Sequence, residues 1–113
     1  MILTDKCKKM FEEWYVLDFN IKRIKLRNIE KEQVLKSFYG LRFEFQQGVY
    51  LEFLREQGYE VAINIFFTPF TGYNYTIYGS HESFINMGRY TGYNTALTQA
   101  ITKCNELING SVK

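Results

Sequence analysis

The sequence contains few of the residues that metal sites and nucleophilic catalysis require. It has one histidine, two cysteines and one proline among 113 residues. A zinc site needs several histidine or cysteine ligands at short spacings, and His81, Cys7 and Cys104 lie far apart along the chain. No glycine-rich phosphate loop leads into a helical pattern, and no nucleophile-elbow motif occurs. We identify no catalytic residues, no metal ligands and no cofactor, and we expect a protein that is not an enzyme.

The sequence also lacks a strong excess of either charge. Fourteen Lys and Arg residues face twelve Asp and Glu residues, which gives a net charge of +2. That value is too small to indicate a nucleic-acid or membrane partner by itself. The densest basic run, from Lys22 to Arg27, could still contact phosphate groups. Nucleic-acid binding is therefore the weakest of three functional hypotheses.

Long apolar runs are missing as well. The longest, from Val61 to Phe67, is interrupted by Asn64 and is far too short to span a membrane as a helix. The first three residues and Thr4 are followed by a cluster of charged ones that begins at Asp5, which does not fit a secretory signal. These absences predict a cytoplasmic protein with no membrane partner. The two cysteines fit apolar helical positions, so buried thiols are favoured over a disulfide.

Charge is nearly absent from a long segment that is rich in tyrosine. Between Tyr59 and Asn94 the only strongly charged side chains belong to Glu60, Glu82 and Arg89. The sequence Thr-Gly-Tyr-Asn occurs twice there, at residues 71–74 and 91–94. Tyrosine, glycine, asparagine and serine are the residues from which binding loops are commonly built. We predict a binding surface that contains Tyr73, Asn74, Tyr75, Tyr78, Arg89, Tyr90 and Tyr93. The alternative is that these tyrosines form the half-buried face of a sheet.

Apolar periodicity predicts helices in the first half of the chain. A stripe at steps of three and four predicts a helix from Asp5 to about Leu17, with Thr4 as its N-cap; its members are Leu3, Cys7, Met10, Trp14 and Leu17. Its end stays open, because Tyr15, Leu17, Phe19 and Ile21 also alternate as in a strand. A second helix is expected over residues 29–38, between Asn28 and Gly40. Residues 41–57 favour a third helix that ends at Gly58, with a buried stripe of Leu41, Phe45, Val49, Phe53 and Leu54. A strand to Phe45 followed by a shorter helix is the alternative.

The second half predicts a sheet and a closing helix. Strands are expected over residues 59–67, 75–78 and 84–90, with a turn at residues 71–74. The last helix begins at Asn94 or Thr95, and its apolar face holds Ala96, Leu97, Ala100, Ile101, Cys104, Leu107 and Ile108. The prediction is a single α+β domain over residues 1–113. N-terminal helices precede a three-stranded antiparallel sheet, and the C-terminal helix packs on that sheet.

One segment resembles a family of small accessory proteins. The run Phe-Tyr-Gly-Leu-Arg-Phe-Glu-Phe-Gln-Gln-Gly-Val-Tyr-Leu-Glu-Phe-Leu, residues 38–54, is similar to proteins carried by bacteriophages and prophages of gut bacteria. The similarity extends to residue 109 and includes Ala96-Leu97, Ala100-Ile101 and the run from Cys104 to Ile108. The resemblance brings no catalytic residues. It implies a viral accessory protein that acts in the host-cell cytoplasm and blocks or diverts a host protein, including proteins of defence systems.

Two further hypotheses stand beside the favoured one. The favoured function is non-enzymatic binding that inhibits or modulates a host protein. The second is a small-ligand or nucleotide binder, with a tyrosine stacking on a base and Arg89 meeting a phosphate. The third is the nucleic-acid-binding accessory protein that uses the basic run. A co-purified small molecule would favour the second hypothesis, and a steep salt dependence of binding would favour the third.

Overall fold

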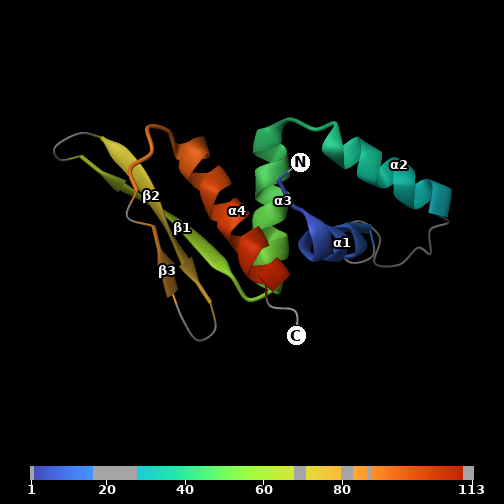
Figure 1. Ribbon diagram of the computed structural model, residues 1–113. Coiled ribbons are helices and arrows are strands. Elements are labelled where there is room, and N and C mark those ends of the chain that lie inside the picture. The colour runs from blue at the N-terminus through green and yellow to red at the C-terminus, as the bar shows by residue number, and fades with distance from the viewer. Residues whose placement is uncertain (1, 17–27, 68–70, 80–82, 87, 111–113) are drawn as a thin grey trace.

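The computed structural model describes residues 2–16, 28–67, 71–79, 83–86 and 88–110. Over these residues the chain forms four α-helices and three strands, in the order α1, α2, α3, β1, β2, β3, α4 (Figure 1). The strands form one antiparallel sheet, and α4 packs on it. The predicted α+β architecture, with N-terminal helices and a C-terminal helix on the sheet, is confirmed.

The first three elements are helices α1 (Asp5–Trp14), α2 (Asn28–Tyr39) and α3 (Phe43–Glu56). Helix α3 confirms the single-helix prediction and ends in a Schellman motif. Gly58 has a φ of 92°, its N–H donates to the Arg55 carbonyl, and the Tyr59 N–H donates to the Leu54 carbonyl. Glycine takes this left-handed conformation without the clash that a Cβ atom causes, so Gly58 turns the chain directly into β1.

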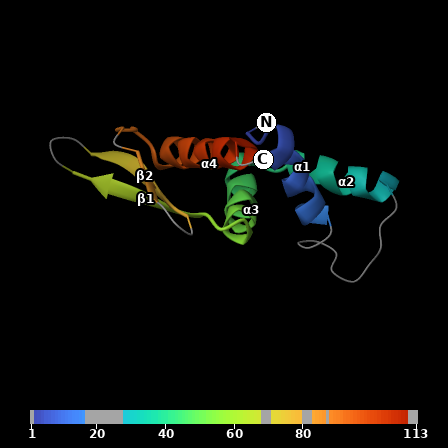
Figure 2. The same cartoon turned by 60° about the horizontal axis from the view of Figure 1, so that its bottom comes forward.

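The sheet consists of β1 (Glu60–Phe66), β2 (Gly72–Tyr78) and β3 (Ser83–Ile85), with β2 in the centre. In the register of β1 and β2, Ile63 lies opposite Tyr75 and Val61 opposite Ile77. Because side chains alternate along a strand, these residues share one face of the sheet. Helix α4 (Tyr93–Gly110) covers that face, and none of the described helices lies on the opposite face, called the outer face below (Figure 2).

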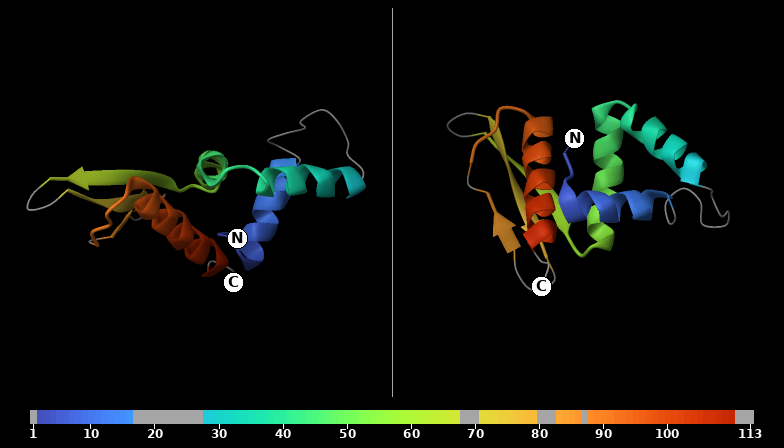
Figure 3. Two further views of the ribbon diagram at one scale, coloured as in Figure 1. Left: turned by 90° about the horizontal axis from the view of Figure 1, so that it is seen from above. Right: turned by 45° about the vertical axis from the view of Figure 1, so that its right-hand side comes forward.

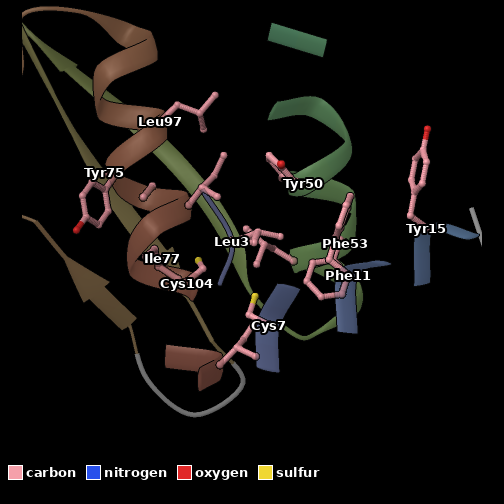
Figure 4. Close-up of a cluster of buried hydrophobic side chains, with 14 of the residues drawn as sticks. Leu3, Cys7, Phe11, Tyr15, Tyr50, Phe53, Tyr75, Ile77, Leu97 and Cys104 are labelled. Atoms are coloured by element: carbon pink, nitrogen blue, oxygen red, sulfur yellow. The ribbon is translucent and has the colours of Figure 1, made fainter. Parts of the chain in front are cut away.

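The molecule is elongated, with the sheet at one end and α2 at the other (Figure 3). Its radius of gyration is 15.5 Å, whereas a compact chain of this length has a value of about 13 Å. The core runs between α1, α3, α4 and the covered face of the sheet. Figure 4 shows Cys7 and Cys104 within it, near Leu3 and Phe11. Both cysteines are buried free thiols, as the sequence favoured.

The buried faces of two helices differ from those that the periodicity predicted. In α1 the centre of the core is Phe11, whose ring is tilted against Phe38 and meets Phe53 edge to face, while Met10 and Trp14 are only partly buried. In α3, Phe45 is 63% exposed and Gln47 is buried. The Gln47 amide donates to the Thr98 hydroxyl of α4 at 3.3 Å. Helix α3 has apolar residues on most of its circumference, so contact with α1 and α4 decides which ones are buried.

Three predicted boundaries in the second half are also wrong. Residues 71–74 were expected to form a turn, but Gly72 begins β2, because it pairs opposite Phe66 of β1. The third strand was expected to reach Tyr90, whereas β3 ends at Ile85 and Tyr90 rejoins the sheet only by an isolated bridge to Tyr73. Helix α4 begins at Tyr93, where the Ala96 N–H already donates to the Gly92 carbonyl.

The start of α1 is held by α4 rather than by its own cap side chain. Thr4 occupies the predicted N-cap position, but its hydroxyl makes no cap bond within α1. That hydroxyl accepts from the Asn105 and Asn109 amides, and the Cys7 N–H donates to Asn109 Oδ1 at 2.8 Å. Asn105 is buried. Two asparagines of the last helix therefore cap the first one.

Candidate binding surface

The two Thr-Gly-Tyr-Asn copies take different local structures and meet in space. The first copy runs into β2, and the second leads into α4. The Tyr73 N–H donates to the Tyr90 carbonyl at 2.9 Å, and the Tyr90 N–H donates to the Tyr73 carbonyl at 2.8 Å. The rings of Tyr73 and Tyr93 meet edge to face, with centroids 6.2 Å apart. Tyr73, Tyr90 and Tyr93, three of the residues predicted to form a site, are thus neighbours.

Residues 88–95, which we call the tyrosine loop, connect the sheet to α4. Six of the eight residues in the loop are exposed, and Tyr90 and Gly92 are half-buried. Tyr93 retains 51% of its accessible surface. The loop is fixed at its start because the Gly88 N–H donates to Asn86 Oδ1 at 2.8 Å. Its middle is tied to Tyr73 and its end is the first turn of α4. The result is an exposed loop whose backbone is held in place.

Tyr75 lies in the core rather than on the binding surface. It is buried, and its ring is nearly parallel to that of Tyr90, with centroids 6.5 Å apart. Burial raises the pKa of the Tyr75 phenol above its usual value, and the nearby Tyr90 adds to the shift. The phenol borders a hollow of about 400 Å³ lined by Ser83, Phe84, Ile85, Asn86 and Lys103. For Tyr75, the interpretation as the buried face of a sheet is the correct one.

The other three predicted residues, Asn74, Tyr78 and Arg89, lie on the outer face of the sheet. Asn74 is buried, and its side-chain oxygen accepts from Asn64 Nδ2 at 2.8 Å. Tyr78 is 50% exposed. The Arg89 guanidinium lies over the Phe66 ring at 4.6 Å from the centroid, a cation–π geometry. The Arg89 stem crosses Gly72, where a Cβ atom would come within 2.6 Å of it.

The predicted set is therefore divided between two faces. Tyr73, Tyr75 and Tyr90 face α4, and Arg89 extends over the opposite face. A nucleotide site that combined the Tyr75 ring with the Arg89 charge does not form in this arrangement. What the structure brings together is a smaller surface, made of the tyrosine loop and Tyr73.

Several residues near this surface were missed in the sequence. Phe66 supplies the ring under Arg89, and Asn64 donates to both Asn74 and Thr76, at 2.8 and 3.0 Å. A signal for them existed. Asn64 interrupts an otherwise apolar strand, and a polar residue in such a strand indicates a hydrogen-bonded partner on the neighbouring strand. Which partner it has depends on the register, which the sequence alone does not specify.

The described residues offer little sign of acid–base chemistry. Burial raises the pKa of Cys7 to about 11 and that of Cys104 to about 12, with the nearby Cys7 adding to the second shift. Thiols with raised pKa values are poor nucleophiles. Within the described ranges, no three His, Cys, Asp or Glu residues come close enough to hold a metal ion. His81 and the basic run from Lys22 to Arg27 lie outside those ranges.

No helix among the described residues has the length and hydropathy needed to cross a membrane. The chain matches no protein-family model, no curated protein and no solved structure.

Proposed function

We propose that this chain is a non-enzymatic binding protein whose tyrosine loop, together with Tyr73, contacts a protein partner. The observation that carries the proposal is that residues 88–95 combine exposed side chains with a fixed backbone. Six of these eight residues are exposed, the segment contains Tyr90 and Tyr93, and its backbone is held at both ends. A loop that is already ordered loses little conformational entropy on binding.

The composition of the loop suits a protein surface. Tyrosine offers a large rigid contact area with a hydroxyl for hydrogen bonding, and the neighbouring Thr, Gly and Asn residues adapt to irregular polar groups. Tyrosine and arginine are also the residues that most often dominate the binding energy of protein interfaces. Arg89 is the only charged residue of the loop, so the contact would be mostly uncharged at its centre.

The partner that we propose is a host-cell protein. The resemblance of residues 38–109 to bacteriophage and prophage accessory proteins supports this choice, because such proteins commonly act on host machinery. Binding alone would then be the activity, and it would inhibit or modulate the host protein, including a protein of a defence system. No step of this proposal requires a cofactor or a chemical reaction.

A small-ligand function remains the second candidate because of one observation. The hollow between β3 and α4 has a volume of about 400 Å³ and brings Lys103 near the buried Tyr75. An anionic small molecule could fit such a place. Mass spectrometry of the denatured purified protein tests this candidate, since a stoichiometric co-purified compound would support it over protein binding.

The main test is a comparison of two tyrosine variants. Tyr93 and Tyr78 are equally exposed, at 51% and 50%, but Tyr78 lies on the outer face, away from the loop. Immobilised parent chain, Tyr93→Ala and Tyr78→Ala are exposed to host lysate, and the captured proteins are identified. We expect a host protein that the parent and Tyr78→Ala retain and that Tyr93→Ala loses. Equal capture by all three chains would exclude the loop as the site.

A further inference from the structure

Strand β1 lies at the edge of the sheet, so one side of its backbone faces no other strand of the described residues. The direction of its hydrogen-bonding groups follows from β2. The Tyr75 carbonyl accepts from the Asn86 N–H, and both backbone groups of Tyr73 bond to Tyr90. The backbone N–H and C=O groups of the odd-numbered residues of β2 therefore point toward β3. The backbone groups of its even-numbered residues must then point toward β1. Since Asn74 pairs with Asn64, the even-numbered residues of β1 bond to β2.

The odd-numbered residues of β1 therefore present their N–H and C=O groups at the free edge. These residues are Val61, Ile63 and Ile65. Over the described part of the chain, no backbone hydrogen bond joins them to another segment. Natural edge strands are usually protected by lysine, proline, a bulge or a covering segment. Strand β1 has seven residues, none of them Lys, Arg or Pro, and its one charged residue is Glu60 at the start.

We propose that β1 pairs with β1 of a second copy of this chain, antiparallel and about a two-fold axis at Ile63. Ile63 is the middle residue of the strand. In this register Ile63 faces Ile63 of the other copy, and Val61 faces Ile65. In each of the three pairs, both N–H groups donate to the carbonyl of the opposite residue, which makes six hydrogen bonds. Any other antiparallel register of the same strands leaves some of these groups unpaired. The dimer would contain a continuous six-stranded sheet.

The exposure of the side chains fits a second copy. Ile65 is 50% exposed, although its strand neighbours Val61 and Ile63 pack against the core. In the proposed pairing Ile65 lies beside Val61 of the other copy on the same face, which removes apolar surface from water. Two isologous contacts of this kind form together, as a two-fold axis requires.

The charges also fit. Glu60 of one copy comes opposite Phe66 of the other, and the Arg89 guanidinium lies over that Phe66 ring. Each carboxylate is thus brought toward a positive charge. The two Glu60 residues stay about 20 Å apart along the strands, which is well beyond the screening length at physiological salt. No like charges face each other across the axis.

This inference is independent of the proposed function. The tyrosine loop joins the sheet through β2, on the side away from the β1 edge, so the dimer would leave one loop open in each copy. Failure of the proposed dimer and failure of the proposed binding function can be told apart by experiment. A monomeric variant that still captures the host partner would separate dimerisation from binding.

The test uses light scattering coupled to size-exclusion chromatography and sedimentation velocity on the full chain. We expect twice the 13.5 kDa mass of one chain at micromolar concentration. Ile65→Pro removes an N–H that points to the free edge and leaves every bond to β2 in place. It should therefore halve the mass and keep the circular dichroism spectrum. Ile65→Thr is the matched control. It changes the same side chain, keeps the N–H, and should remain dimeric.

A cross-linking pair tests the register and does not depend on the proline variant folding. In the proposed dimer Ala62 of one copy lies opposite Asn64 of the other in a non-hydrogen-bonded pair, which suits a disulfide. A mixture of Ala62→Cys and Asn64→Cys chains should give an oxidised heterodimer, whereas each variant alone should not. A monomeric parent, or a dimer with no mixed cross-link, would overturn the proposal.

Discussion

Thr4 and Asn105 exchange two hydrogen bonds although 101 residues separate them. The Thr4 N–H donates to Asn105 Oδ1 at 2.8 Å, and Asn105 Nδ2 donates to the Thr4 hydroxyl at 3.0 Å. The first N–H groups of a helix have no partner within it and need one from elsewhere. Here the last helix supplies them, so the two ends of the chain are joined at the start of α1.

Loss of this link should destabilise the whole domain. We predict that Asn105→Ala lowers the free energy of unfolding by about 1–3 kcal/mol, because the part-buried Thr4 N–H loses its acceptor and the Thr4 hydroxyl keeps only the Asn109 amide. Urea denaturation followed by circular dichroism measures the change. Gln99→Ala on the exposed side of the same helix is the control and should have little effect. Equal stabilities of the two variants would show that the link contributes nothing.

The covered face of α4 should tolerate no charge. Ala100 and Ile101 have no accessible surface. Ala100→Asp buries a carboxylate without a partner, and we expect the chain not to fold at 25 °C. Gln99→Asp places the same charge one residue away on the exposed side and should fold. The melting temperatures of both variants are compared with that of the parent. An Ala100→Asp chain that melts within two degrees of the parent would refute the packing of α4 on the sheet.

The two buried thiols give the stability a defined pH dependence. Their pKa values are raised from 9.0 to about 11 for Cys7 and to about 12 for Cys104, chiefly because burial disfavours the thiolate. Unfolded thiols lose their protons at a lower pH than folded ones. Their contribution to stability is therefore complete below about pH 9 and is lost as the pH rises through about 11 for Cys7 and about 12 for Cys104.

Two measurements check this behaviour. The free energy of unfolding should fall between pH 9 and pH 11, and the fall should be smaller in Cys104→Ala. At pH 8 the native chain should react slowly with a thiol reagent, and the denatured chain should release two fast equivalents. A native mass two hydrogens lighter than the sequence would instead reveal a disulfide.

Part of this fold could be read from local sequence signals, and part could not. The end of α3 was predictable because Gly58 takes a left-handed conformation that favours glycine whatever the rest of the fold is. The apolar stripe of α4 is equally local. The burial of Gln47 in place of Phe45 is not, since the surrounding helices select the buried face of α3. The roles of Asn105 and Asn109 depend on a contact with the other end of the chain.

The candidate surface shows the same division. Composition alone pointed to the region of Tyr73 and Tyr93, and the structure brings these two rings together. The identical tetrapeptides nevertheless differ in structure, because Gly72 pairs with a neighbouring strand and Gly92 precedes a helix. The separation of Arg89 from Tyr75 depends on strand alternation and register, which require the paired sheet to be known.

The affinity of the tyrosine loop for its partner tests most directly whether this loop is the binding surface. Once capture from host lysate has identified that protein, its dissociation constant is measured with the parent chain, Tyr93→Ala and Tyr78→Ala, beside a melting curve for each. We predict that Tyr93→Ala weakens binding by about 1–3 kcal/mol, roughly five- to 150-fold, with an unchanged melting temperature. Tyr78→Ala should bind like the parent. Equal affinity of all three chains, or a loss confined to Tyr78→Ala, would contradict the assignment of the loop as the binding surface.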